Sequence, residues 1–129
     1  MTEPAPARAQ TILVADDDPD LVALVERRLV KAGYLVITAV DGEQATHMAE
    51  QLLPQLAVLD VDMPKFTGVE VVQQLRGNPA TRHIPTMLIS AGFRDEDVGV
   101  GSGDIADDCV KKPFGRDELV KRVRALLAR

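Results

Sequence analysis

The sequence contains only one cysteine, Cys109. One cysteine cannot form a disulfide within the chain, which excludes a fold held together by disulfides. No hydrophobic run approaches the roughly 20 residues that a membrane-spanning helix needs, and the first ten residues lack the apolar core of a signal peptide. These absences predict a soluble, cytoplasmic protein that does not bind membranes.

Basic residues are in the minority, with 15 Lys and Arg against 20 Asp and Glu. A protein that coats nucleic-acid phosphates needs a basic face, so this deficit argues against direct nucleic-acid binding. A glycine-rich phosphate loop is also missing after the first apolar run, where residues 16–19 read Asp-Asp-Asp-Pro instead. His47 and His83 have no second nitrogen or sulfur ligand at metal-binding spacing, which argues against a zinc site.

The chain does contain a regular alternation of short apolar runs and amphipathic stretches. Its 129 residues are the length of one domain. Residues 1–10 are predicted to be a disordered tail, followed by a folded domain of residues 11–129. The apolar runs cover residues 11–15, 34–38, 56–59, 86–89 and 108–110. Such runs are typical of buried parallel strands. We therefore predict one doubly wound, flavodoxin-like (βα)5 domain of the α/β class, with five parallel strands in the order 2-1-3-4-5 and helices on both faces.

The stretches between the runs carry the signals of helices. Asp18 is placed to cap the first helix, Pro19 suits its first position, and Gly33 follows its end. Thr67 is placed to cap the third. The fourth helix is expected to be short, frayed or distorted, because three glycines fall within residues 98–104. Helical spacing predicts these buried positions: Leu21, Leu24, Val25 and Leu29; Ala45, Met48, Ala49 and Leu52; Val69, Val72 and Leu75; Leu119, Val123, Leu126 and Leu127.

Acidic residues end two strands that this topology makes neighbours. Ligands of doubly wound sheets bind at the carboxyl ends of the strands, beside the reversal of winding, here between the first and third strands. Asp16 and Asp17 follow the first strand, and Asp60 ends the third. Crowded carboxylates repel one another unless a cation lies between them. Hard oxygen ligands with room for water favour Mg²⁺ over Ca²⁺ or zinc.

Ser90 and Lys112 lie at the ends of the fourth and fifth predicted strands. A cation, a lysine and a hydroxyl around one carboxylate can stabilise phosphoryl charge on it. Asp60 is the only carboxylate that ends the central strand, so it is the candidate acceptor. Each residue alone has a simpler explanation, such as a solvated loop or, for Asp18, a helix cap. Their coincidence at one edge of the sheet favours a site.

The same segments resemble the receiver domain of two-component response regulators. Residues 12–19 (ILVADDDP) look like the family's acidic opening, and residues 59–64 (LDVDMP), followed by Gly68, look like its phosphoacceptor loop. Ser90 with the next alanine resembles its hydroxyl switch, and residues 106–114 (ADDCVKKPF) resemble its Lys-Pro signature. The resemblance covers the whole of the predicted domain, with the motifs in the family's order.

The resemblance implies a phosphorylation-dependent switch rather than an enzyme with a separate substrate. Asp60 would accept a phosphoryl group from a phosphohistidine, on a sensor kinase or a histidine phosphotransfer protein, and water would later remove it. Mg²⁺ would be bound by the side chains of Asp17 and Asp60, by the backbone carbonyl of Asp62, and by Asp16 partly through water. Lys112, before a cis proline bond, would pair with the phosphoryl oxygens.

In the family, the hydroxyl at Ser90 couples phosphorylation to the fourth helix, together with an aromatic residue three positions before Lys112. This chain has Cys109 there, and a thiol cannot act as a bulky rotor. Our hypothesis is that signalling relies on order and disorder of residues 98–104. The resemblance makes a homodimer through the fourth and fifth helices one option, and the Arg and Lys residues of the last helix suit a solvated face equally well. The sequence does not identify the downstream partner, nor whether the chain is a stand-alone receiver or part of a longer regulator.

Three alternatives account for part of the pattern. Residues 60–62 (Asp-Val-Asp) also resemble the motif of haloacid-dehalogenase-type phosphatases, in which that motif ends the first strand. A receiver-like module that only binds, and is never phosphorylated, would have an incomplete acidic site. A flavodoxin would need a first loop that accepts phosphate, and residues 16–18 would repel one.

Overall fold

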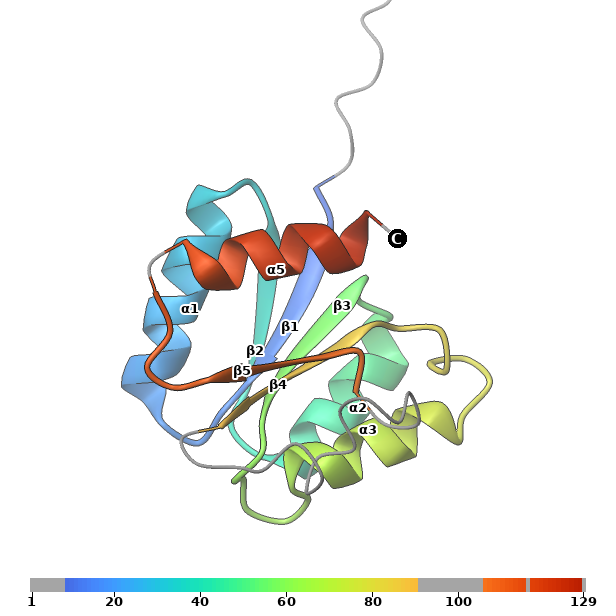
Figure 1. Cartoon of the computed structure of the whole chain (residues 1–129). Coiled ribbons are helices and arrows are strands. Elements are labelled where there is room, and N and C mark those ends of the chain that lie inside the picture. Colours follow the sequence, from blue (N-terminus) through green and yellow to red (C-terminus); the bar gives the residue numbers. More distant parts are fainter. Residues whose placement is uncertain (1–8, 91–105, 116, 129) are drawn as a thin grey trace, which may run out of the picture.

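The computed structural model describes residues 9–90, 106–115 and 117–128. Five parallel strands form one sheet in the order β2-β1-β3-β4-β5 (Figure 1). The strands are β1 (Thr11–Ala15), β2 (Leu35–Ala39), β3 (Leu56–Asp60), β4 (Thr86–Ser90) and β5 (Asp108–Lys111). The winding reverses between β1 and β3, so the predicted doubly wound topology is confirmed.

Four helices cover the sheet in the described part of the chain. They are α1 (Pro19–Lys31), α2 (Gly42–Leu52), α3 (Gly68–Arg76) and α5 (Glu118–Leu127). α1 and α5 pack on one face, and α2 and α3 on the other (Figure 1). The predicted fourth helix falls within residues 91–105, outside the described residues. None of the described helices combines the length and the apolar character needed to cross a bilayer.

The predicted helix ends are confirmed. The Asp18 carboxylate accepts hydrogen bonds from two backbone N–H groups in the first turn of α1, whose first residue is Pro19. After α1, Gly33 has a φ of 104°, a left-handed conformation that a residue without Cβ adopts easily. Thr67 caps α3 in a reciprocal capping box with Glu70. These ends fix where each helix begins relative to the carboxyl edge of the sheet.

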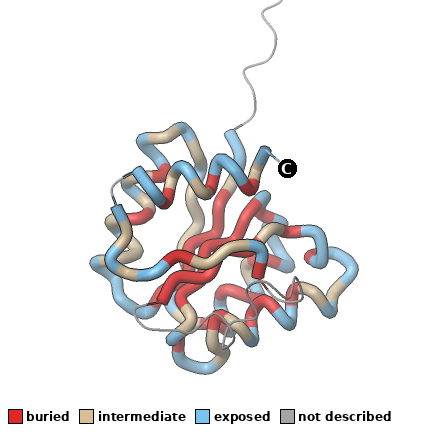
Figure 2. Tube along the Cα trace, in the orientation of Figure 1, coloured by how far each residue is buried: buried red, intermediate tan, exposed pale blue. Residues whose placement is uncertain are grey.

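The core lies in two layers, one on each side of the sheet. β3 and β4 are buried along their whole length, and most of their residues are red in Figure 2. The edge strand β2 differs from the predicted burial on both faces, since its first residue, Leu35, is 57% exposed. β2 has a neighbouring strand on one side only, so its start is open to solvent.

Two predicted core positions differ in the structure: Leu24 is only half-buried and belongs to neither core layer, and the prediction for Leu52 is wrong. Leu52 is 55% exposed, because it is the last residue of α2, and the chain turns away at Leu53 in a left-handed conformation. Conversely, Val71 is buried together with Val72, although the helical spacing indicated only Val72. α3 contacts both α2 and β4, so two sides of this helix are covered.

Candidate functional site

Three carboxylates meet at the carboxyl edge of β1 and β3. Asp16 directly follows β1 and Asp60 is the last residue of β3; both are buried, with exposed fractions of 4% and 5%. Asp17 is exposed. One ligand oxygen from each of the three residues lies within 4.8 Å of the others. The parallel pairing of β1 with β3 causes this convergence, since it brings both strand ends to one edge.

Lys112 supplies a positive charge to this cluster. Its Nζ atom lies 3.4 Å from Asp16 Oδ2 and 3.6 Å from Asp60 Oδ2. The residue follows β5, and its backbone N–H donates a 2.8 Å hydrogen bond to the Ser90 carbonyl oxygen. The Lys112–Pro113 peptide bond is cis, as the family resemblance implies. The four residues of the cluster thus come from three separate segments of the sequence.

The backbone after Asp60 is held tightly. The Asp62 N–H donates a 3.3 Å hydrogen bond to Asp60 Oδ1, and the Gly68 N–H donates to the Val61 carbonyl. A Cβ atom on Gly68 would collide with the carbonyl oxygen of Asp60. The turn therefore requires glycine at Gly68, which fixes the direction in which the chain leaves the end of β3.

A second close approach, between Gly42 and Phe66, holds the other end of this turn. A Cβ atom on Gly42, the first residue of α2, would collide with the carbonyl oxygen of Phe66. Lys65 forms ion pairs with Asp41 at 3.8 Å and with Glu43 at 3.7 Å. The sequence alone does not reveal this support. Its only sequence signal is an Asp-Gly pair ahead of α2, which is common in turns.

Burial is the main reason why Asp60 is an unusual acid. The pKa of the Asp60 carboxyl is raised to about 6, mainly by burial and next by the negative charge of nearby Asp16. Lys112 and the hydrogen bond from the Asp62 backbone act in the opposite direction but are outweighed. Burial, together with the neighbouring negative charge of Asp16, therefore destabilises the ionised form of Asp60.

The donor set fits a small divalent cation. Asp16, Asp17 and Asp60 offer carboxylate oxygens alone, which are the hard ligands of Mg²⁺. Asp17 is exposed, which leaves room for water in the coordination shell. The Asp62 side chain is exposed, and the part of Asp62 that contacts the cluster is its backbone.

Ser90 and Cys109 lie on the neighbouring strands. Ser90 ends β4 and is 3% exposed, one position beyond Ile89, which is paired with Asp60. Cys109 is half-buried in β5, in register with Leu88, and packs against the core on the α2 and α3 side. Cys109 thus packs against apolar side chains of the core, in the strand next to that of Ser90.

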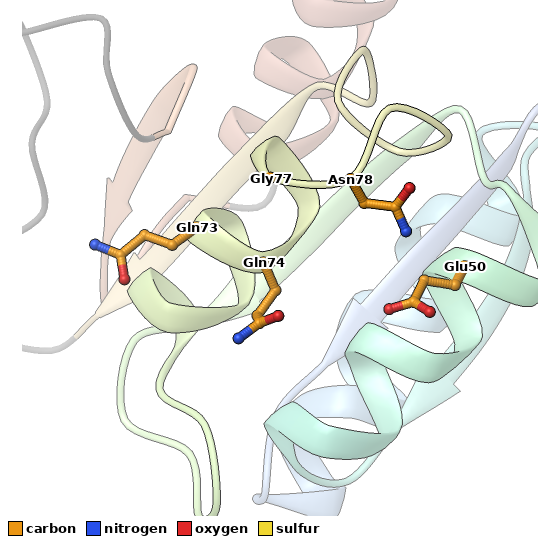
Figure 3. Close-up of a pocket in the computed structure, with 5 residues that line it drawn as sticks. All are labelled: Glu50, Gln73, Gln74, Gly77 and Asn78. Carbon is orange, nitrogen blue, oxygen red and sulfur yellow. The ribbon is translucent and has the colours of Figure 1, made fainter.

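A cavity of about 280 Å³ lies elsewhere, between the last turns of α2 and α3 (Figure 3). Glu50 extends from α2 toward α3, whereas Gln73 points away from α2. Its lining has one carboxylate and three amides, and it lies at the amino edge of the sheet, opposite Asp60. This cavity contributes nothing to the acidic cluster.

Comparison with known proteins gives a consistent result. The family model described as "Response regulator receiver domain" matches residues 12–124. The DNA-binding dual master transcriptional regulator RpaA of a Synechocystis strain is 43% identical over 118 residues, which are 92% of this chain and 49% of RpaA. The chain spans about half the length of the curated relatives it matches.

Solved structures agree with the sequence relatives. A Chloroflexus aurantiacus protein assigned as a response regulator superposes with a TM-score of 0.87 at 33% identity, over 95% of this chain and 100% of the other. The receiver domain of the sensor histidine kinase PA1611 of Pseudomonas aeruginosa gives 0.84 at 26% identity, over 94% and 99% of the two chains. With the matched fold, motifs and acidic cluster, this chain belongs to the response regulator receiver domain family.

Proposed function

We propose that the domain accepts a phosphoryl group on Asp60 and acts as a phosphorylation-dependent switch in a two-component phosphorelay. The observation that carries this proposal is the contact of one lysine, Lys112, with two buried carboxylates, Asp16 and Asp60, at the reversal of winding. A buried carboxylate is the nucleophile of such a transfer, and the cations around it offset the charge that arrives with the phosphoryl group.

The donor would be a phosphohistidine on a sensor kinase or a histidine phosphotransfer protein. An oxygen of the Asp60 carboxylate forms the new bond to phosphorus. The bond from phosphorus to the imidazole nitrogen breaks, and the imidazole keeps the electron pair. Lys112 pairs with the phosphoryl oxygens and the Ser90 hydroxyl donates a hydrogen bond to them. Water that later attacks the same phosphorus restores the carboxylate and releases phosphate.

We propose that Mg²⁺ is held by the carboxylates of Asp17 and Asp60, by the backbone carbonyl of Asp62 and by Asp16 partly through water. The cation supplies electrostatic stabilisation of the charge on the transferred group. Two observations support this assignment: the convergence of three carboxylates, and the magnesium ion described in the active-site cleft of the PA1611 receiver domain.

We further propose that the folded domain spans residues 11–129 and works in the cytoplasm. The signal would pass from Ser90 to residues 98–104, and Cys109 would not act as the usual aromatic rotor because its thiol is small and the residue is half-buried against the core. The output partner would be a downstream protein or a second copy of the domain. Hydrogen exchange in residues 98–104 that is unchanged by phosphorylation would contradict this route.

The central test is intact-mass spectrometry after incubation with acetyl phosphate and Mg²⁺. We expect the protein to gain the mass of one phosphoryl group in the presence of Mg²⁺. It should gain no mass when EDTA replaces Mg²⁺. Asp60→Asn should gain no mass. Asp62→Asn is the matched control, because it removes a nearby exposed carboxylate, and it should still be phosphorylated.

Two outcomes would overturn the proposal. Failure of the wild type to gain mass, together with failure to bind beryllofluoride, would indicate a binding module that is not phosphorylated. Multiple turnover of a phosphomonoester would favour the phosphatase alternative. That alternative fits the fold poorly, because Asp60 ends the third strand in the sequence and not the first.

A further inference from the structure

A groove of about 840 Å³ lies between α1 and α5, within the roughly 300–1,000 Å³ range of ligand-binding clefts. Its residues from α1 begin at Leu24, the sixth residue of that helix, and include none from the first turn, which begins beside Asp16. It is therefore distinct from the acidic cluster. The charged side chains that line it are Arg27, Arg28, Lys31, Lys121, Arg124 and Asp117.

The charge of the groove is opposite to that of the chain. Five basic groups and one acidic group give the groove a formal charge of +4, while the whole chain carries −5, so the remainder carries −9. None of the five basic groups forms an ion pair with an acidic residue in the described part of the chain. Arg122, on another side of α5, pairs with Asp108 at 2.8 Å and with Glu118 at 3.6 Å.

Arg28 shows that few negative groups offset the positive charge of the groove. Its guanidinium carbon lies 5.8 Å from the centre of the Phe114 ring, which provides a cation–π contact. Its Nη1 atom is buried and makes no hydrogen bond to any described residue. The side chain is therefore held by an aromatic ring and not by a carboxylate, and its positive charge stays available in a partly desolvated place, where an added carboxylate interacts more strongly than in water.

We propose that this groove binds an acidic amphipathic helix of a partner protein. Apolar surface from Leu24, Ala32 and Val120 lies among the basic groups, which suits a helix with apolar residues on one face and Glu or Asp beside them. A long nucleic acid or an anionic membrane would also meet the strongly negative remainder of the surface. A short helix contacts the groove alone, so the charge distribution favours it.

The proposal is independent of phosphorylation at Asp60 and is tested by fluorescence anisotropy. The probe is a labelled synthetic 16-residue helix with Leu on one face and Glu on the other; its partner probe has every Glu replaced by Gln. The protein variants are Lys121→Glu and Arg124→Glu, both at exposed positions. The matched control is Arg82→Glu, an exposed cation in the segment between α3 and β4.

We expect the Glu probe to bind at least about tenfold more tightly than the Gln probe, and each groove reversal to weaken it about fivefold or more, since each removes attraction and adds repulsion. Arg82→Glu should change the affinity less than about twofold, and Asp60→Asn should leave it unchanged. Equal binding of the two probes, no binding of either, or an equal effect of Arg82→Glu would overturn the proposal. Tighter binding of a 20-nucleotide single-stranded DNA or of phosphatidylglycerol vesicles would also overturn it.

Discussion

The ammonium of Lys112 lies 3.4 Å from a carboxylate oxygen of Asp16, although 96 residues separate the two in the sequence. Asp16 shares this lysine with Asp60, which is 3.6 Å from it. One positive charge therefore serves two buried carboxylates, and Asp17 adds a third carboxylate nearby. The site is short of positive charge, so a divalent cation bound there would offset the carboxylates and also the negative charge that arrives with a phosphoryl group.

Replacing Lys112 by Met is expected to strengthen Mg²⁺ binding and, at the same time, to slow phosphorylation. Loss of the ammonium removes a charge that repels Mg²⁺ and leaves the carboxylates less compensated, so the Mg²⁺ affinity should rise at least about fivefold. The phosphoryl group would lose its lysine partner, so the rate with acetyl phosphate should fall at least about tenfold. Calorimetric Mg²⁺ titration and timed mass spectrometry measure the two effects.

Lys111→Met is the control for that experiment. Lys111 is exposed and pairs with no acid in the described part of the chain, so its replacement should leave both quantities within about twofold of the wild type. Weaker Mg²⁺ binding in Lys112→Met would show that the lysine supports the metal site instead of competing with the cation.

Asp60→Asn is expected to stabilise the metal-free protein above pH 6. The pKa of Asp60 is about 6 in the folded state and 3.8 without the fold, so its contribution to stability is fully present below pH 4 and is lost as the pH rises through 6. Asn has no such loss. Between pH 4 and pH 8, the variant should gain on the order of 1–3 kcal/mol over the wild type in the free energy of unfolding.

Urea denaturation in EDTA at several pH values measures this difference. Asp62→Asn is the control, because that side chain is exposed and should show no such pH-dependent gain. Adding Mg²⁺ at pH 8 should stabilise the wild type more than Asp60→Asn. A stability difference that does not change between pH 4 and pH 8 would show that ionised Asp60 is not destabilised by the fold.

The fold follows from the sequence because its signals are local and agree with one another. Apolar runs, the Asp18 and Thr67 caps and Gly33 each predict an element end that the structure confirms. The convergence of Asp16 with Asp60 also follows, since parallel strands bring their carboxyl ends to one edge. Once the strand order is predicted, the position of the acidic cluster can be predicted without further information.

The remainder depends on packing that no local pattern encodes. The exposure of Leu52 is decided by where α2 ends relative to the sheet, and the burial of Val71 by the contact of α3 with α2. The Lys65 ion pairs with Asp41 join two loops that are far apart in the sequence. The groove between α1 and α5 follows from no local pattern either, because its basic residues come from opposite ends of the chain.

Gly68→Ala is expected to destabilise the domain and to slow phosphorylation of Asp60. The new Cβ would collide with the Asp60 carbonyl oxygen, and it would lie 2.9 Å from the carbonyl carbon and 3.0 Å from Leu88 Cδ2. Because a backbone atom must move, the free energy of unfolding should fall by about 2 kcal/mol or more.

Gly77→Ala is the control for Gly68→Ala, since a Cβ at Gly77 meets only ordinary contacts at 3.5 Å and longer, at a φ of −78°. It should be neutral or stabilise by a few tenths of a kcal/mol. Chemical denaturation and phosphorylation rates distinguish the two; equal effects would contradict the tight approach at Gly68.

Arg76→Lys is expected to destabilise the domain almost as much as Arg76→Met, by about 1–3 kcal/mol in the free energy of unfolding. Arg76 is the last residue of α3. One end of its guanidinium, Nη1, donates to two backbone carbonyl oxygens at 2.8 and 2.9 Å; the other, Nη2, donates to Thr86 Oγ1 and, at 2.8 Å, to Asp107 Oδ2. An ammonium cannot reach both sets of acceptors, because Lys lacks the planar fork.

Arg82→Lys is the control for Arg76→Lys. Arg82 is exposed and its side chain donates one 3.3 Å hydrogen bond, so its replacement should cost less than about 0.5 kcal/mol. Urea denaturation measures all three variants. Arg76→Lys with the stability of the wild type would mean that charge alone, without the fork geometry, holds α3 to the starts of β4 and β5.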